Sequence, residues 1–127
     1  MLSFLAFLGA ALAVAQPVPL VIYHTNDIHG ELDQAPLLST VLKAERRPYL
    51  FLDSGDWFQG TPEGNLTRGN AAIDVLNQLG LDASVIGNHD YDYGEENVER
   101  LANLAQFTVL GSNIMRDGKL VDYVKPR

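Results

Sequence analysis

Residues 49–60, with the sequence YLFLDSGDWFQG, join a short apolar run directly to a polar turn that contains two glycines. The run from Tyr49 to Leu52 favours a β-strand, and Asp53-Ser54-Gly55-Asp56 ends it because these residue types favour turns. A strand that is apolar along its whole length is expected in a parallel sheet with both faces covered. The stretch therefore predicts a buried parallel strand with carboxylates at its carboxyl end.

Apolar runs and helix-like stretches alternate through the rest of the chain. Further strands are predicted at residues 19–24, 83–86 and 107–110, and a hairpin or edge segment at residues 119–124. Apolar residues at helical spacing predict helices at residues 36–46, 70–79 and 95–105. Pro36 suits the first turn of one helix, and Gly80 suits the C-terminal stop of another. This alternation is typical of an α/β fold, in which a parallel sheet carries helices on its faces.

The composition limits the classes of protein to which the chain can belong. Its 127 residues suit a single domain at most, and an apolar content of 46% is ordinary for a globular core. A net charge of −7 argues against nucleic acid and anionic membranes as partners, because both attract basic surfaces. The absence of Cys excludes disulfides and thiolate metal sites.

The first residues have the features of an export signal. No Asp, Glu, Lys or Arg occurs before His24, and the initial apolar run ends in the small-residue pattern Ala13-Val14-Ala15. The run is shorter than the roughly 20 residues that a membrane-spanning helix needs. We predict a cleaved signal peptide at residues 1–15, a partial domain at residues 16–127 and a secreted or periplasmic location. The alternatives are a buried helix and an uncleaved anchor, and only the anchor makes a membrane a partner.

Three polar clusters stand where three of the predicted strands end. They are residues 24–30 (HTNDIHG), 53–60 (DSGDWFQG) and 87–92 (GNHDYD). Gly, Asn and Asp favour tight turns for backbone reasons, so a turn explains any one cluster alone. Three in succession, two of which combine His with Asp, favour a functional site. Ligands of open α/β sheets bind at the carboxyl ends of the strands, which is where these clusters fall.

The clusters supply ligands suited to a pair of divalent ions. Asp27 and His29, two residues apart, offer a carboxylate oxygen and an imidazole nitrogen to one ion. Asp56 can bridge two ions through its two oxygens, and Asn88 offers a carbonyl oxygen to the second ion. Such mixed ligands suit Zn, Mn, Fe or Co, and two ions about 3.5–4 Å apart clamp a phosphoryl group. Capped turns are the alternative interpretation of the same residues.

The motifs Asp27-x-His29, Gly55-Asp56-x-x-Gln59 and Gly87-Asn88-His89-Asp90 resemble the first three motifs of the calcineurin-like metallophosphatases. The longer strings around them are similar to those of the 5'-nucleotidase and 2',3'-cyclic-nucleotide phosphodiesterase branch, whose members are typically exported. The resemblance covers residues 20–115. It implies the N-terminal half of an α-β-β-α metallophosphatase sandwich, and such a half leaves the inner face of its sheet uncovered.

The resemblance also implies a role for each residue. Asp27 and His29 would bind the first of two divalent metal ions, Asp56 would bridge, and Asn88 would bind the second ion and the substrate. His89 would contact the phosphate as transition-state stabiliser or general acid. The implied reaction is hydrolysis of a nucleotide or other phosphoester, through in-line attack on phosphorus by a metal-activated hydroxide.

The resemblance leaves the partner of His89 and the completeness of the site open. Asp92 is the expected orienting carboxylate for His89, which would set the tautomer of its ring, and Asp90 is the alternative. The family completes its site with His residues from later motifs, whereas this chain has three His in all, of which His89 is the last. His24 is interpreted as a strand-end residue. The chain alone is therefore expected to be inactive, and the alternatives to a hydrolase are an inactive truncated remnant and an exported metal-binding module.

Overall fold

The computed structural model describes residues 17–127, so the predicted signal peptide lies outside the described residues. The elements in chain order are β1 (Val21–Thr25), α1 (Ala35–Ala44), β2 (Tyr49–Asp53), α2 (Pro62–Leu66), α3 (Asn70–Leu79), β3 (Ala83–Val85), the 3-10 helix η1 (His89–Tyr93), α4 (Glu95–Leu104), β4 (Thr108–Leu110), β5 (Met115–Arg116) and β6 (Lys119–Leu120). The four strands and three helices predicted before residue 111 all form. Within residues 17–127, no helix is long and apolar enough to cross a membrane.

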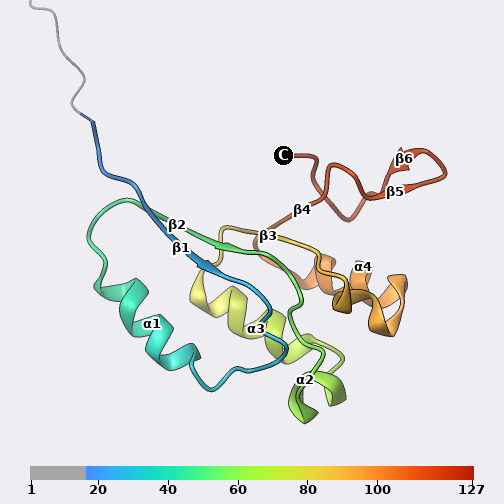
Figure 1. Ribbon diagram of the computed structural model, residues 1–127, viewed down its shortest axis with the longest axis horizontal. Coiled ribbons are helices and arrows are strands. Elements are labelled where there is room, and N and C mark those ends of the chain that lie inside the picture. The colour runs from blue at the N-terminus through green and yellow to red at the C-terminus, as the bar shows by residue number, and fades with distance from the viewer. Residues whose placement is uncertain (1–16) are drawn as a thin grey trace, which may run out of the picture.

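The main sheet is parallel throughout, and its strand order β1-β2-β3-β4 follows the chain. Each crossover between neighbouring strands contains a helix, as is usual for parallel strands. In the register, Tyr23 lies opposite Phe51, and Ser84 lies between Asp53 and Val109. Because the strands run the same way, all four carboxyl ends lie at one edge of the sheet (Figure 1).

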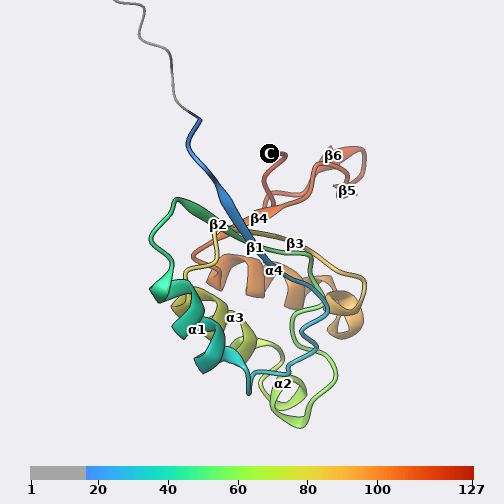
Figure 2. The same cartoon turned by 60° about the vertical axis from the view of Figure 1, so that its left-hand side comes forward.

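Helices α1, α3 and α4 lie on the same side of the sheet in both views (Figures 1 and 2). Their apolar stripes pack on β2 and β4 to form the core. Gly80 ends α3 as predicted, with a left-handed φ of 74° and its N–H directed at the last carbonyls of the helix. The largest fully buried apolar side chains are Trp57, Phe51, Phe58, Ile73, Leu76, Leu101 and Val98.

The other face of the sheet is open in the part of the chain that the structure describes. Ile22, Leu50 and Val85, on three neighbouring strands, are 56%, 38% and 41% exposed. The prediction that both faces are covered is therefore wrong for residues 17–127, because all three long helices pack on one side. The α/β class itself is confirmed, and the open face agrees with the half-sandwich that the motifs imply.

Two short helices were not predicted. Thr61 caps α2, where its Oγ1 accepts a hydrogen bond from the Gly64 N–H at 3.1 Å, and Pro62 occupies the first turn. The other is η1, which lies within the third polar cluster. The predicted hairpin begins before residue 119, since β5 and β6 pair antiparallel, and Lys125 then bridges back to Leu110 of β4.

Candidate metal centre

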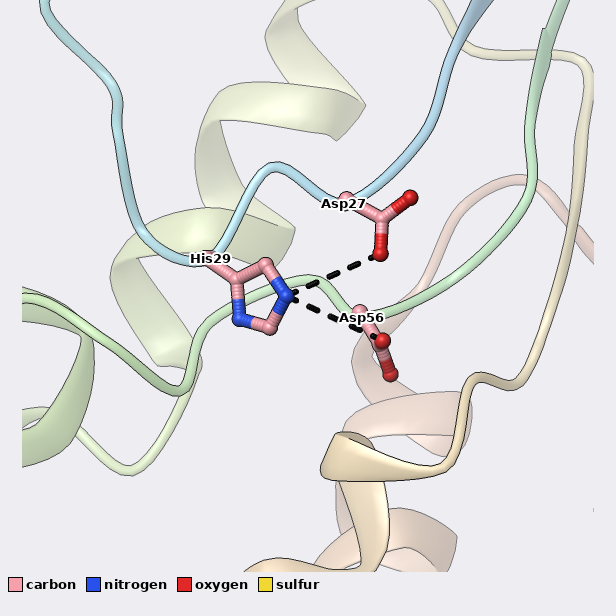
Figure 3. A group of neighbouring side chains, drawn as sticks. All are labelled: Asp27, His29 and Asp56. Carbon is pink, nitrogen blue, oxygen red and sulfur yellow. Dashed lines mark ion pairs between the residues drawn. The ribbon is translucent and has the colours of Figure 1, made fainter.

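Asp27, His29 and Asp56 converge beyond the carboxyl ends of β1 and β2, with their side chains directed at one another (Figure 3). His29 Nε2 lies 3.7 Å from Asp27 Oδ1 and 3.8 Å from Asp56 Oδ2. One possible ligand atom from each residue lies within 4.8 Å of the other two. Two carboxylates and an imidazole around one point suit a divalent transition-metal ion, so the donors fit the metal that the sequence predicts.

The three converging residues share an uncommon backbone conformation. Asp27, His29 and Asp56 have φ values of 53°, 49° and 59°, in the left-handed region that residues other than Gly seldom adopt. Two hydrogen bonds between the loops hold this shape: the Asp27 N–H donates to the Gly55 carbonyl at 3.2 Å, and the His29 N–H donates to the Asp56 carbonyl at 2.9 Å. Backbone strain of this kind clusters at functional sites, where the surrounding contacts maintain it.

His29 is held in the tautomer that a metal ion requires. Its Nδ1 lies 2.6 Å from the carbonyl oxygen of Gln59. A carbonyl oxygen only accepts, so Nδ1 carries the proton and Nε2 presents its lone pair toward the two carboxylates. Gly60 makes the close approach possible, because a Cβ there would come within 2.7 Å of the His29 carbonyl oxygen.

The Asp56 carboxylate joins two loops. Its Oδ2 faces His29, whereas its Oδ1 accepts a hydrogen bond from the His89 N–H at 2.8 Å. Gly87 packs directly against it, since a Cβ on Gly87 would lie 2.1 Å from Asp56 Oδ1. The loop after β3 is thereby brought against the loop after β2. Asn88 lies in that loop, exposed at the same edge of the sheet as the other predicted ligands.

Asn88 also lines a cavity of about 720 Å³ at the carboxyl ends of β3 and β4. Ser112 and Asn113, which follow β4, also line this cavity. His24, interpreted from the sequence as a strand-end residue, is exposed on β1 and is not among the three residues that converge.

His89 and Asp92 lie together as the sequence predicts. His89 Nδ1 lies 2.9 Å from Asp92 Oδ2 within η1. This hydrogen bond is the main reason that the pKa of His89 is raised above its usual value. With Nδ1–H directed at the carboxylate, Nε2 is left to give or take a proton. The ring centroids of His89 and His29 are 5.3 Å apart, so the pair stands beside the candidate metal centre.

Asp90 makes different contacts from those considered in the sequence. It is fully buried, and its carboxylate accepts hydrogen bonds from the backbone N–H groups of Asp56, Trp57 and Gly87 at 2.8–2.9 Å. Burial raises the pKa of Asp90 to about 6, although the three donors act in the opposite direction. The oxygens of Asp90 are directed at these amides, whereas the side chain that His89 contacts is that of Asp92.

A second buried carboxylate ties three strand ends together. Asp53, at the end of β2, accepts hydrogen bonds from Thr25 Oγ1 at 2.7 Å, Ser84 Oγ at 2.8 Å and Trp57 Nε1 at 3.0 Å. Its Oδ1 also accepts the Gly55 N–H at 2.8 Å, which anchors the residue before Asp56. One feature of the sequence indicates this role: Asp53 is a carboxylate at the end of an otherwise apolar strand.

The fold and the site together define a parallel α/β protein with a candidate metal centre at the carboxyl edge of its sheet. The chain belongs to the calcineurin-like phosphoesterase family, whose sequence profile matches residues 20–124. It is similar to the 5'-nucleotidase of Bos taurus, with 34% identity over 92% of this chain and 24% of that protein. It is also similar to the snake venom 5'-nucleotidase of Crotalus adamanteus, with 32% identity over 91% of this chain and 23% of that protein.

The fold is likewise similar to a solved structure, the 5'-nucleotidase precursor from Thermus thermophilus. The TM-score is 0.68 and the identity 31%, over 74% of this chain and 22% of that one. These similarities confirm both the α/β class and the family that the motifs resemble. The chain spans about a quarter of the length of the relatives that it matches, 24% for the bovine protein.

Proposed function

We propose that the chain forms the metal-binding and phosphate-contacting part of a phosphoester hydrolase that acts on nucleotides. The convergence of Asp27, His29 and Asp56 beside the His89–Asp92 pair carries the proposal. Membership of the phosphoesterase family supports the class of reaction. The similarity to several 5'-nucleotidases supports a nucleotide as the substrate.

The donors fit two divalent ions of Mn, Zn, Fe or Co. Asp27 and His29 would hold the first ion, Asp56 would contribute to both, and Asn88 would contribute to the second and to substrate binding. When bound, the ions neutralise charge on the phosphoryl group and lower the pKa of a coordinated water. The left-handed loops and the hydrogen bond to the Gln59 carbonyl direct the donors toward one point, which supports a metal ion there.

His89 would act on the phosphoryl group rather than on the metal. Asp92 holds Nδ1 and with it the plane of the ring, so that Nε2 is the nitrogen available to a phosphate oxygen. From there it can donate a hydrogen bond to developing negative charge, or a proton to a leaving group. Asp92 in this proposal positions His89 and does not itself contact the substrate.

Metal binding by the chain itself tests the site. Mn²⁺ titrated into the wild-type chain should bind, and Asp56→Asn should weaken binding by roughly tenfold or more, because the negative charge and one of the two ligand oxygens are lost. Asp82→Asn is the matched control. The Asp82 carboxylate also accepts a backbone N–H, that of Phe51, but Asp82 lies just before β3, at the opposite edge of the sheet. Equal Mn²⁺ affinities for wild type and Asp56→Asn would contradict the proposed ligand set.

A chimera tests the reaction. Residues 20–124 would replace the matching segment of the Thermus thermophilus relative, which supplies the rest of its own chain. We expect 5'-AMP hydrolysis that EDTA abolishes and Mn²⁺ or Zn²⁺ restores. Cooperative thermal unfolding shows whether the chimera is folded. A folded chimera that hydrolyses no phosphoester with any of the four candidate metals would rule the proposed function out.

We also propose that the protein is exported. The uncharged apolar N-terminal segment and its Ala13-Val14-Ala15 pattern support export, and one similar protein is a snake venom component. Cleavage after Ala15 should leave Gln16 as the first residue of the secreted protein, which N-terminal sequencing checks. Recovery of the protein in the membrane fraction with Met1 intact would favour the uncleaved anchor instead.

A further inference from the structure

Asp90 is a buried carboxylate that belongs neither to the proposed metal ligands nor to the His89–Asp92 pair. It is 0% exposed, and every oxygen of its carboxylate is occupied by backbone donors. Oδ2 accepts the N–H groups of Asp56 and Gly87, each at 2.9 Å, and Oδ1 accepts the Trp57 N–H at 2.8 Å. Asp90 thus binds main-chain atoms of two separate loops with one side chain.

The three amides belong to the two loops that carry the predicted bridging ligand and the predicted ligand of the second ion. Two of them are the N–H groups of Asp56 and Trp57. The third is the N–H of Gly87, the residue before Asn88. A reciprocal contact runs the other way, since Asp56 Oδ1 accepts the N–H of His89 at 2.8 Å. The two loops are therefore joined by two carboxylates that cross between them, with Gly87 packed in the contact.

We propose that Asp90 is a positioning residue that sets the spacing between Asp56 and Asn88, and so the affinity of the site for divalent cations. The inference rests on the proposed function, because it takes these two side chains as metal ligands. Asp90 itself would bind no ion, since its oxygens are buried and already accept three hydrogen bonds.

The chemistry of the contact explains why a carboxylate is needed. Three N–H donors converge on two oxygens that can only accept when ionised. An amide of the same shape has one oxygen and one NH₂ group. In Asp90→Asn the NH₂ must face either the Trp57 N–H or the paired N–H groups of Asp56 and Gly87, which places donor against donor. The isosteric change should therefore separate the two loops without creating a cavity.

Mn²⁺ affinity of the whole chain, measured by calorimetric titration, tests the inference. We expect Asp90→Asn to bind Mn²⁺ roughly 10- to 100-fold more weakly than wild type, the usual effect of removing a group that orients a metal ligand. Two controls separate positioning from stability. Asp82→Asn makes the same isosteric change at a carboxylate that accepts the N–H of Phe51 at the far edge of the sheet, and Leu101→Ala removes a buried side chain of α4 and so lowers stability. Both should keep wild-type affinity in the folded state.

The outcomes are distinct. Equal Mn²⁺ affinities for folded Asp90→Asn and wild type would overturn the inference alone. A wild-type chain that binds no Mn²⁺ would overturn the proposed function and this inference with it. If Asp90→Asn does not fold, hydrogen exchange in the wild type decides: the amides of Asp56, Trp57 and Gly87 should exchange as slowly as the amides within β2. Fast exchange at these three positions would show that Asp90 does not hold the loops together.

Discussion

Two glycines at the candidate metal centre are required by contact between loops and not only by turn geometry. A Cβ on Gly55 would lie 2.3 Å from the Gly87 backbone nitrogen, and Gly55 has a φ of 90°. A Cβ on Gly87 would lie 2.4 Å from the Asp56 nitrogen. The backbones of the two loops are thus in direct contact at these glycines, with no side chain between them. That approach lets side chains from separate strands share one small volume.

The substitution His89→Asn tests whether His89 contacts the phosphate or binds the metal. In the chimera we expect turnover of 5'-AMP to fall roughly 100- to 10,000-fold, the usual contribution of a general acid or charge-stabilising group. Mn²⁺ affinity should stay near the wild-type value, because the backbone N–H that binds Asp56 is retained. Steady-state kinetics and Mn²⁺ titration check the two parts. Loss of metal along with activity would make His89 a ligand instead.

The geometry of η1 decides which carboxylate pairs with His89. A 3-10 helix has three residues per turn, so side chains three apart lie on the same side. His89 and Asp92 meet this spacing and stay accessible at the edge of the sheet. Asp90, one residue after His89, is turned toward the core and meets the loop after β2. In the proposed site, one short helix would therefore serve the phosphate contact on one side and loop positioning on the other.

The strands that carry the site are short, so the helices behind them must supply most of the stability. β3 and β4 have three residues each, too few to be stable without packing. α4 packs its buried side chains behind them, with Val98 and Leu101 both 0% exposed. The site at the carboxyl edge therefore depends on an apolar contact on the covered face of the sheet.

Two leucines of α4 test that dependence. Leu101→Ala should lower the free energy of unfolding by about 2–5 kcal/mol, because it removes a fully buried side chain and leaves a cavity. Leu104→Ala is the matched control on the same helix: this side chain is 46% exposed, and a change of about 0.5 kcal/mol or less is expected. Urea titration of both variants measures the difference. Equal losses would show that α4 does not pack as described.

The two proposed ions would receive unequal sets of donors from this chain. The first would have two carboxylates and an imidazole, from Asp27, His29 and Asp56. Among residues 17–127, the second would have a share of Asp56 and the amide of Asn88. The chain contains no His after His89 that could add to either. The described residues therefore favour occupation of the first position over the second.

We accordingly expect the 127-residue chain by itself to bind Mn²⁺. Its turnover of 5'-AMP and bis(p-nitrophenyl) phosphate should be far below the kcat of about 10 per second that is typical of enzymes. A phosphate-release assay on a sample with a cooperative thermal transition checks this, and the chimera is the positive control. An ordinary enzymatic rate from the chain alone would mean that other donors complete the site. His24 on β1 would be the first to examine.

Much of this molecule could be predicted because its signals are local. Apolar runs that end in turn residues predicted β1 to β4, and helical spacing with Pro36 and Gly80 predicted α1 and α3 almost to the residue. The short helices were harder, since α2 is only five residues long and depends on its Thr61 cap. The one-sided cover of the sheet followed only from the family resemblance, because an apolar strand by itself carries no sign of which layer packs on which face.

The α/β class, the family and the candidate metal ligands could be predicted from the sequence, because strand ends and short motifs are properties of neighbouring residues. How those residues are arranged depends on the tertiary structure. It brought Asp56 against His29, left Asp92 beside His89, and turned Asp90 to three amides, two of them more than thirty residues away. Such contacts depend on which strands lie side by side and on how closely their loops approach. No local pattern of residues specifies either.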